Sequence, residues 1–291
     1  MAIPLAGMAV FFLWQWFHGG ITPQEVMDEV RAVGAPASAA PAPVRAERSE
    51  RDDGRVAPAS THAEALPKVT RRKHRGDIVL IIDDLGFDGQ PLDRLMALDP
   101  NVNVAILPNG TRAAEFANRL NARGFEVLCH LPMQPRGREV PGRNAILTSM
   151  TDDEIARTTR ENILAIPHAR GVNNHMGSLA TTDRRVMTSV IGALPEGMYF
   201  VDSRTAGTSI AGTVAREMNV RTATRNIFLD DVASEKAVRK QLADLAAAAE
   251  KKGVAIGIGH PYPVTMRVLA DEMPQLRAQG FRFVRASQIV R

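Results

Sequence analysis

The stretch Ile78-Val79-Leu80-Ile81-Ile82-Asp83-Asp84-Leu85-Gly86 decides how the rest of the chain is interpreted. Its five consecutive apolar residues, four of them β-branched, predict a strand that is buried on both faces, as in a parallel sheet covered by helices. Two adjacent carboxylates at the end of such a strand repel each other and lose solvation, so both stay ionised only beside a compensating positive charge. Asp83 and Asp84 therefore indicate either a cation site or a cap on the following helix.

Downstream of this stretch, strand-like runs alternate with segments of helical periodicity. This alternation predicts βαβ units and a parallel sheet. The predicted strands are Ile78–Ile82, Val102–Leu107, Glu126–Cys129, Gly171–Asn173, Met198–Val201, part of Arg221–Leu229 and Val254–Gly259, with a last short run at Phe281–Val284. The predicted helices are Thr111–Arg123, Asp152–Ile166, Arg184–Ala193, Ser209–Asn219, Ser234–Lys252 and Val264–Gln279, the last disturbed by Pro274.

Polar residues follow most of the predicted strands. A doubly wound open sheet places its site at one switch point, whereas a parallel α/β barrel assembles its site from the carboxyl ends of several strands. The pattern therefore favours an α/β fold with parallel strands in a distorted (β/α)7-type barrel. The strand-end residues are Asp83 and Asp84, Pro108 and Asn109, His130, Asn173 to His175, Asp202 to Arg204, Asp230 and Asp231, and His260.

Three of these residues suggest a metal centre. Asp84, His130 and His175 offer one carboxylate and two imidazoles, and catalytic zinc sites use three such protein ligands with a further position for water. The sequence thus predicts one divalent ion, with zinc the expected metal. Taken alone, His130 is better interpreted as a core histidine bonded to backbone, whereas the glycine-containing polar segments around His175 and His260 favour a functional role.

The remaining strand-end aspartates have simpler interpretations. Asp202 follows the apolar Tyr199–Val201 run and is predicted either to cap a helix or to orient a histidine. Asp230 and Asp231 are expected chiefly to cap the helix that starts near Ser234.

The residues before the barrel have a different composition. Residues 1–19 contain an apolar run with both tryptophans and predict a hydrophobic anchor or signal segment. An uncleaved anchor is the preferred interpretation, followed by a cleaved export signal and then by a buried helix. Residues 20–76 are rich in Ala, Pro and charged residues and predict a disordered linker. The expected layout is a barrel of residues 77–291 tethered to the inner membrane, in the periplasm or another extracytoplasmic compartment.

Overall composition excludes some functions. The 291 residues are 45% hydrophobic, which suffices for a large core, and carry a formal charge of +4 with a pI near 9.6. The basic residues are not interleaved with aromatics in any nucleic-acid-binding motif, so nucleic acid is not expected as a partner. Cys129 is the only cysteine, which excludes an internal disulfide.

Five short motifs resemble the divergent polysaccharide deacetylase family, a branch of the NodB-type polysaccharide deacetylases. They occur in the expected order between Asp77 and Arg291. The resemblance implies a distorted barrel of about seven strands and the metal-dependent removal of N- or O-acetyl groups from a cell-envelope polysaccharide or a peptidoglycan-like glycan. The motifs are Ile81-Ile82-Asp83-Asp84-Leu85-Gly86, His130-Leu131-Pro132-Met133, Asn173-Asn174-His175-Met176-Gly177-Ser178, Val201-Asp202-Ser203-Arg204 and Gly259-His260-Pro261.

The resemblance also implies catalytic roles. The first aspartate of the family's pair is the general base and the second is a metal ligand, which maps onto Asp83 and Asp84. Asp202 matches the strand-five aspartate, and His260 matches the general acid on the last strand. Metal-activated water would attack the acetyl carbonyl with Asp83 as base, while His260 would protonate the leaving amine or alcohol.

One position departs from the family pattern. His130 matches the first histidine of the usual His-x-x-x-His metal motif, but Gln134 occupies the second position. His175 is the residue that could supply the missing ligand. Two alternatives therefore stay open beside the deacetylase: a non-catalytic envelope glycan-binding or regulatory module on the same fold, and a metal-dependent phosphoesterase with two ions.

Overall fold

The computed structural model describes residues 74–291, which belong to a compact unit of residues 71–291. The predicted anchor or signal, residues 1–19, and nearly all of the predicted linker, residues 20–76, lie outside the described residues. Within the described residues, no helix is both long enough and apolar enough to cross a membrane.

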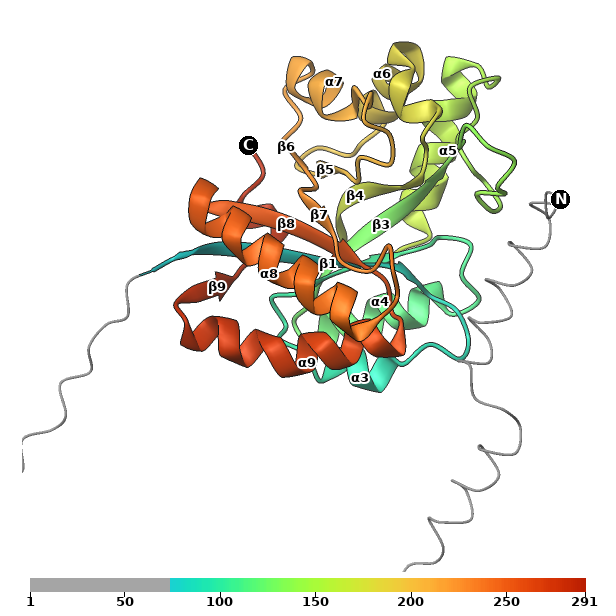
Figure 1. Ribbon diagram of the computed structural model, residues 1–291. Coiled ribbons are helices and arrows are strands. Elements are labelled where there is room, and N and C mark those ends of the chain that lie inside the picture. The colour runs from blue at the N-terminus through green and yellow to red at the C-terminus, as the bar shows by residue number, and fades with distance from the viewer. Residues whose placement is uncertain (1–73) are drawn as a thin grey trace, which may run out of the picture. The chain divides into compact units, whose positions relative to one another are not determined.

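The described chain is built around one nine-stranded sheet in which every pairing of named strands is parallel (Figure 1). The strand order is β6-β5-β4-β3-β2-β1-β8-β7, and β9 pairs with β1. The predicted parallel α/β architecture is confirmed. The strands β6 and β7 end the order, so the curled sheet stays open between them in the described part of the chain. The strands are β1 (Gly76–Leu85), β2 (Asn103–Ile106), β3 (Glu126–Met133), β4 (Ala169–Met176), β5 (Tyr199–Asp202), β6 (Thr222–Thr224), β7 (Ile227–Phe228), β8 (Val254–Gly259) and β9 (Phe281–Phe283).

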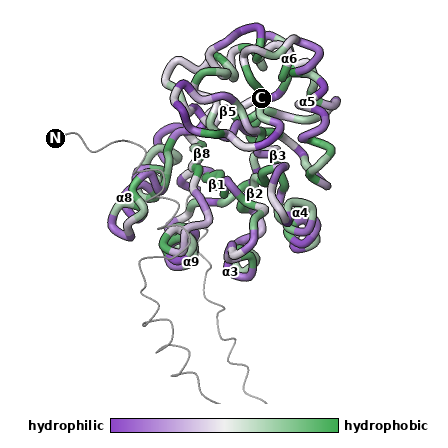
Figure 2. Tube along the Cα trace, turned by 90° about the vertical axis from the view of Figure 1, so that its right-hand side faces the viewer, coloured by the Kyte–Doolittle hydropathy of each residue, from purple (hydrophilic) through white to green (hydrophobic). Residues whose placement is uncertain are grey.

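Helices cover the outside of this sheet. Figure 2 shows α8, α9, α3 and α4 in a row along the outer side of β8, β1, β2 and β3. The five-residue helix α3 follows Pro91 and was not predicted, because so short a segment shows no helical periodicity. The helices are α3 (Leu92–Met96), α4 (Ala113–Ala122), α5 (Asp152–Leu164), α6 (Arg184–Gly192), α7 (Ala211–Glu217), α8 (Glu235–Lys252) and α9 (Pro263–Ala278).

The helix α9 contains Pro274 and continues past it to Ala278. A proline inside a helix removes one backbone hydrogen-bond donor. The neighbouring residues Met273 and Leu276 are buried against the core, so packing holds the helix together across this position.

The strand β1 is buried on both faces, as its sequence predicts. Ile78, Leu80 and Ile82 belong to the core between sheet and helices. Val79 and Ile81 belong to a second apolar cluster on the opposite face, inside the curl of the sheet. Side chains alternate along a strand, so a continuous apolar run is the sequence pattern that fills both layers.

The start of α5 carries a complete capping box. The Thr151 hydroxyl accepts from the Glu154 amide at 3.3 Å, and the Glu154 carboxylate accepts from the Thr151 amide at 2.8 Å. Thr151→Ala is therefore expected to lower the free energy of unfolding by about 1 kcal/mol. Urea denaturation of the full chain measures this loss. Ser149→Ala is the control, because Ser149 is exposed, and a loss equal to that of Thr151→Ala would contradict the capping role.

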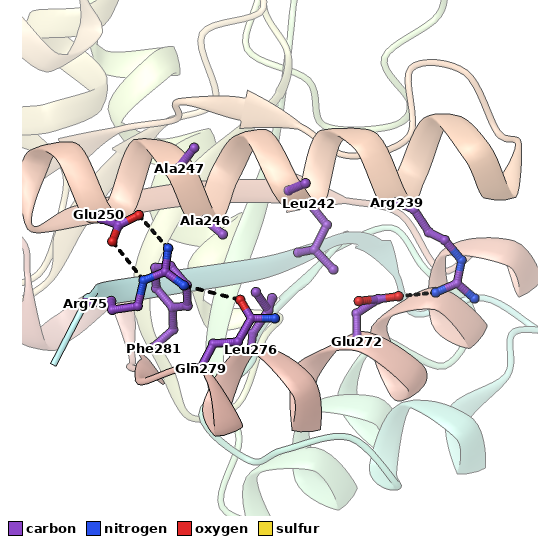
Figure 3. Close-up of a pocket in the computed structure, with 11 residues that line it drawn as sticks. Arg75, Arg239, Leu242, Ala246, Ala247, Glu250, Glu272, Leu276, Gln279 and Phe281 are labelled. Atoms are coloured by element: carbon purple, nitrogen blue, oxygen red, sulfur yellow. Dashed lines mark hydrogen bonds and ion pairs between the residues drawn. The ribbon is translucent and has the colours of Figure 1, made fainter. Parts of the chain in front are cut away.

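The outer layer contains a cavity of about 240 Å³ between α8 and α9 (Figure 3). An ion pair of Arg75 with Glu250 at 2.6 Å lies at one end, and an ion pair of Arg239 with Glu272 lies at the other. Its lining includes none of the predicted site residues. The chemistry that the sequence predicts is therefore elsewhere, at the carboxyl ends of the strands.

Candidate metal centre

The end of β1 brings two adjacent carboxylates to one histidine. Asp84 has a backbone φ of 58°, in the left-handed region, which breaks the side-chain alternation of the strand. As a result, Asp83 Oδ2 and Asp84 Oδ1 lie 3.5 Å and 3.2 Å from the same His130 Nε2. The next helix begins only after Pro91, so the interpretation of these aspartates as helix caps is wrong.

The structure brings the three predicted ligands together. His175 Nδ1 lies 2.8 Å from Asp84 Oδ1, and the donor atoms of Asp84, His130 and His175 all lie within 4.8 Å of one another. The Asp84 Oδ1 atom is buried and no hydrogen bond satisfies it. Ligand atoms bound to zinc at about 2.1 Å in a tetrahedron would lie about 3.4 Å apart. The orphaned oxygen, the two imidazoles and their separations therefore fit a single divalent ion.

His130 and His175 were predicted to follow their strands. Both instead lie inside strands, His130 in β3 and His175 in β4. The ladder between β3 and β4 continues to the pair Met133 and Met176, beyond His130 and His175. The predicted strand ends at Cys129 and Asn173 are therefore wrong. The predictions stopped there because a polar histidine and a proline follow Cys129 and polar residues follow Val172, whereas the backbone pairing does not depend on those side chains.

Gln134 does not reach the centre. Its side-chain oxygen accepts from the Thr148 amide at 2.7 Å and from the Thr148 hydroxyl at 2.9 Å. Gln134 thus holds the loop between β3 and α5, and the residue that joins Asp84 and His130 in the candidate centre is His175 on the neighbouring strand.

The floor of the centre is a buried hydrogen-bonded group. The Asn173 amide nitrogen donates to Asp83 Oδ1 at 2.8 Å, and His130 Nδ1 lies 2.9 Å from the Asn173 oxygen. Burial raises the pKa of Asp83 above its usual value, against the opposing charges of His130 and His260. Burial disfavours protonated His130, but the charge of Asp83 and the contact with Asp84 outweigh it and raise the His130 pKa. Burial also disfavours ionised Asp84, yet His130 and His175 hold its pKa well below the usual value.

His260 enters the site from the end of β8 and is supported by Asp230. Its Nδ1 lies 2.9 Å from Asp230 Oδ1, its backbone amide donates to Asp230 Oδ2 at 2.7 Å, and its Nε2 lies 3.8 Å from Asp84 Oδ2. Thr265 donates to the same carboxylate at 2.7 Å. The helix α8 is capped by Ser234, so the prediction that Asp230 and Asp231 cap it is wrong.

Asp230 was missed because its partner is 30 residues away in the chain. The signal that could have found it is register. Phe228 on β7 pairs with Ile258 on β8, so the residues two positions farther along, Asp230 and His260, leave the sheet side by side.

Asp230→Asn is expected to lower the pKa of His260 from about 9 toward its ordinary value of 6.5 in the metal-free protein. Burial lowers this pKa, but the bond to Asp230 and the charges of Asp84 and Asp230 outweigh it. Because the folded-state pKa is raised, the stabilisation from His260 is complete below about pH 6.5 and is lost as the pH rises through about 9. NMR titration of the His260 ring measures the shift, and an unchanged pKa in the variant would refute the support by Asp230.

Asp202 serves the loop after β5. Its Oδ1 accepts from the Arg204 amide and its Oδ2 from the Ser209 hydroxyl, both at 2.8 Å. Among the described residues, Asp202 neither caps a helix nor bonds to a histidine, contrary to both predictions. The reason is the turn at Arg204, with φ of 50°, which folds the loop back onto the carboxylate.

Exposure divides the site into a floor and an open side. Asp83, His130 and Asn173 are at most 2% exposed, whereas the side chains of Asp84, His175 and His260 are 30%, 16% and 24% exposed. A carboxylate with a raised pKa, three residues that could hold a metal ion, and a histidine whose pKa is raised beside an aspartate meet where solvent enters. This arrangement can activate a water molecule and protonate a leaving group.

Comparison with known proteins agrees with the fold and with the motifs. The chain is 37% identical over 216 residues to the uncharacterized protein YibQ of Escherichia coli K12, covering 74% of this chain and 67% of that one. It is 36% identical over 195 residues to an uncharacterized protein of Haemophilus influenzae, covering 66% and 69%. The solved structure of ATU2773, an uncharacterized protein from Agrobacterium tumefaciens C58, matches with a TM-score of 0.72 at 19% identity, covering 75% of this chain and 90% of that one.

The family comparison covers most of the described residues. The model of the divergent polysaccharide deacetylases matches residues 80–290, which include the strand-end residues described above. The chain belongs to the divergent polysaccharide deacetylase family.

Proposed function

We propose that the protein is a metal-dependent deacetylase that hydrolyses acetyl groups on a cell-envelope polysaccharide. The observation that carries this proposal is the convergence of Asp84, His130 and His175 beside Asp83 and the Asp230-supported His260. Membership of the deacetylase family supports the same conclusion. One fold can carry an active or a non-catalytic site, so these side chains and not the fold support the proposed activity.

Asp84, His130 and His175 would hold one divalent ion, with zinc the expected metal. When bound, the ion would acidify a water molecule and polarise the acetyl carbonyl. The donor set of one carboxylate and two imidazoles suits zinc. Among residues 74–291, this is the single group of three or more potential ligand residues within reach of one ion, which favours one ion over the two of a phosphoesterase.

Two side chains of the protein would carry out the proton transfers of the reaction. Asp83 would accept a proton from the attacking water, because its raised pKa makes it a stronger base than an exposed carboxylate. The oxygen of that water adds to the acetyl carbon, and the bond from this carbon to the sugar nitrogen or oxygen breaks. His260 would donate the proton that the leaving amine or alcohol needs, since Asp230 keeps it protonated.

The N-terminal segment fits the same proposal. Residues 1–19 would anchor the chain to the inner membrane, and the barrel would act on glycan in the periplasm. Fractionation of cells that express the full chain tests this placement. Recovery of the protein in the cytoplasm would contradict it.

The proposed activity is tested on the purified full chain. Elemental analysis is expected to find about one zinc or similar ion per chain, and acetate release is expected from N-acetylglucosamine oligomers or from O-acetylated xylan. A chelator should abolish the release and added zinc should restore it. Absence of metal after incubation with zinc, together with retained glycan binding, would favour the non-catalytic glycan-binding module. Two ions per chain would favour the phosphoesterase.

A further inference from the structure

Asn173 lies between the proposed base, Asp83, and the proposed metal ligand His130. It lies on β4, is fully buried, and pairs in register with His130 on β3. Its amide nitrogen donates to Asp83 Oδ1 at 2.8 Å and to Ser203 Oγ at 3.2 Å. Its oxygen lies 2.9 Å from His130 Nδ1. One side chain therefore contacts both the proposed base and a proposed metal ligand.

The orientation of this amide follows from its neighbours. An ionised carboxylate only accepts hydrogen bonds, so the end of Asn173 that faces Asp83 is the NH₂ group. The amide oxygen, which also only accepts, is left to face His130. In neutral His130 the proton must then be on Nδ1, which leaves the lone pair of Nε2 directed at Asp84, 3.2 Å away.

We propose that Asn173 is a positioning residue that fixes His130 in its metal-binding tautomer and at the same time orients the Asp83 carboxylate. This inference rests on the proposed function, because it assigns His130 as a ligand and Asp83 as the base. By holding Asp83 Oδ1, the amide leaves Oδ2 to face the side of the centre where His130 Nε2 lies, 3.5 Å away. A carboxylate at position 173 could accept a hydrogen bond from His130 but could not donate one to Asp83, so an amide is required.

The neighbouring Asn174 provides a matched control. It is 1% exposed, and its amide group binds the backbone at Met176 O and Ser203 N, at 2.7 Å and 2.9 Å, with a longer contact to the Thr205 hydroxyl. Asn174 is thus equally buried and equally hydrogen-bonded, but it contacts neither Asp83 nor His130. Its replacement shows what the loss of a buried asparagine does to stability alone.

The experiment compares Asn173→Ala, Asn173→Asp and Asn174→Ala in the full chain. Zinc affinity is measured by competition with a chromogenic chelator. The His130 tautomer is measured by long-range proton–nitrogen NMR of the metal-free protein, at a pH above the raised pKa of His130, where the ring is neutral. Asn173→Ala is expected to bind zinc about 10- to 100-fold more weakly and to lose the uniform Nδ1–H tautomer. Asn173→Asp is expected to keep the zinc affinity and the Nδ1–H tautomer, because its carboxylate accepts a hydrogen bond from His130 Nδ1. It should nevertheless lose acetate release, because it places a second negative charge against Asp83.

Stability separates this role from a merely structural one. Asn174→Ala is expected to lower the urea midpoint and to leave zinc affinity and the His130 tautomer as in the unchanged protein. Asn173→Ala with unchanged zinc affinity and an unchanged Nδ1–H tautomer would overturn the inference. An unchanged protein that binds no zinc would instead overturn the proposed function, while the tautomer would still report on Asn173.

Discussion

Asp84→Asn is expected to reduce the zinc content of the full chain from about one ion to none at micromolar zinc. Asp84 is the one carboxylate of the ligand set, and its Oδ1 faces both imidazoles at 2.8 Å and 3.2 Å. Asparagine keeps the size of the side chain and tolerates the left-handed backbone at this position. The substitution therefore removes the charge and little else, and affinity should fall more than 100-fold, beyond the loss expected for residues that only support ligands.

Elemental analysis after dialysis measures this loss. Asp88→Asn is the matched control, because Asp88 lies four residues farther along and its side chain is 74% exposed. This variant should retain its zinc. A zinc content that is equal in Asp84→Asn and in the unchanged protein would exclude Asp84 as a ligand, and with it the proposed centre.

Asp83→Asn is expected to lower kcat for acetate release about 10²- to 10⁴-fold, with zinc content unchanged. The amide that replaces the carboxylate cannot accept a proton from water. Asp83 Oδ1 is held by Asn173, and its Oδ2 lies 3.5 Å from His130 Nε2, close to the ligands but outside the predicted set. The loss should therefore appear in the chemical step and not in metal binding.

Steady-state rates on the acetylated probe, at equal zinc content, test this expectation. Asp231→Asn serves as the control, because Asp231 is an exposed aspartate that follows a strand but lies outside the centre. Full activity of a zinc-loaded Asp83→Asn variant would remove Asp83 as the base and leave the metal assignment standing.

Hydropathy predicts that Asp83, Asp84 and Asp230 follow buried strands, but it does not predict the role of each aspartate. The apolar run before Asp83 predicts a strand buried on both faces, and the acids that end it mark the active edge of a parallel sheet. Asp230 also follows an apolar strand-like run, but its interpretation as a helix cap was wrong because Ser234 caps α8. Whether an acid at a strand end caps a helix or supports a histidine depends on which strand lies beside it.

The sequence by itself determined the parallel α/β architecture and the three residues of the candidate metal centre, Asp84, His130 and His175. Burial of apolar runs and their alternation with helices depend on local composition, which a single sequence contains. The tertiary structure alone decided how far β3 and β4 extend, the left-handed turn at Asp84, and the contacts of Asn173 and Asp230. These depend on hydrogen-bond register between strands that are distant in the chain, and side-chain pattern does not encode that register.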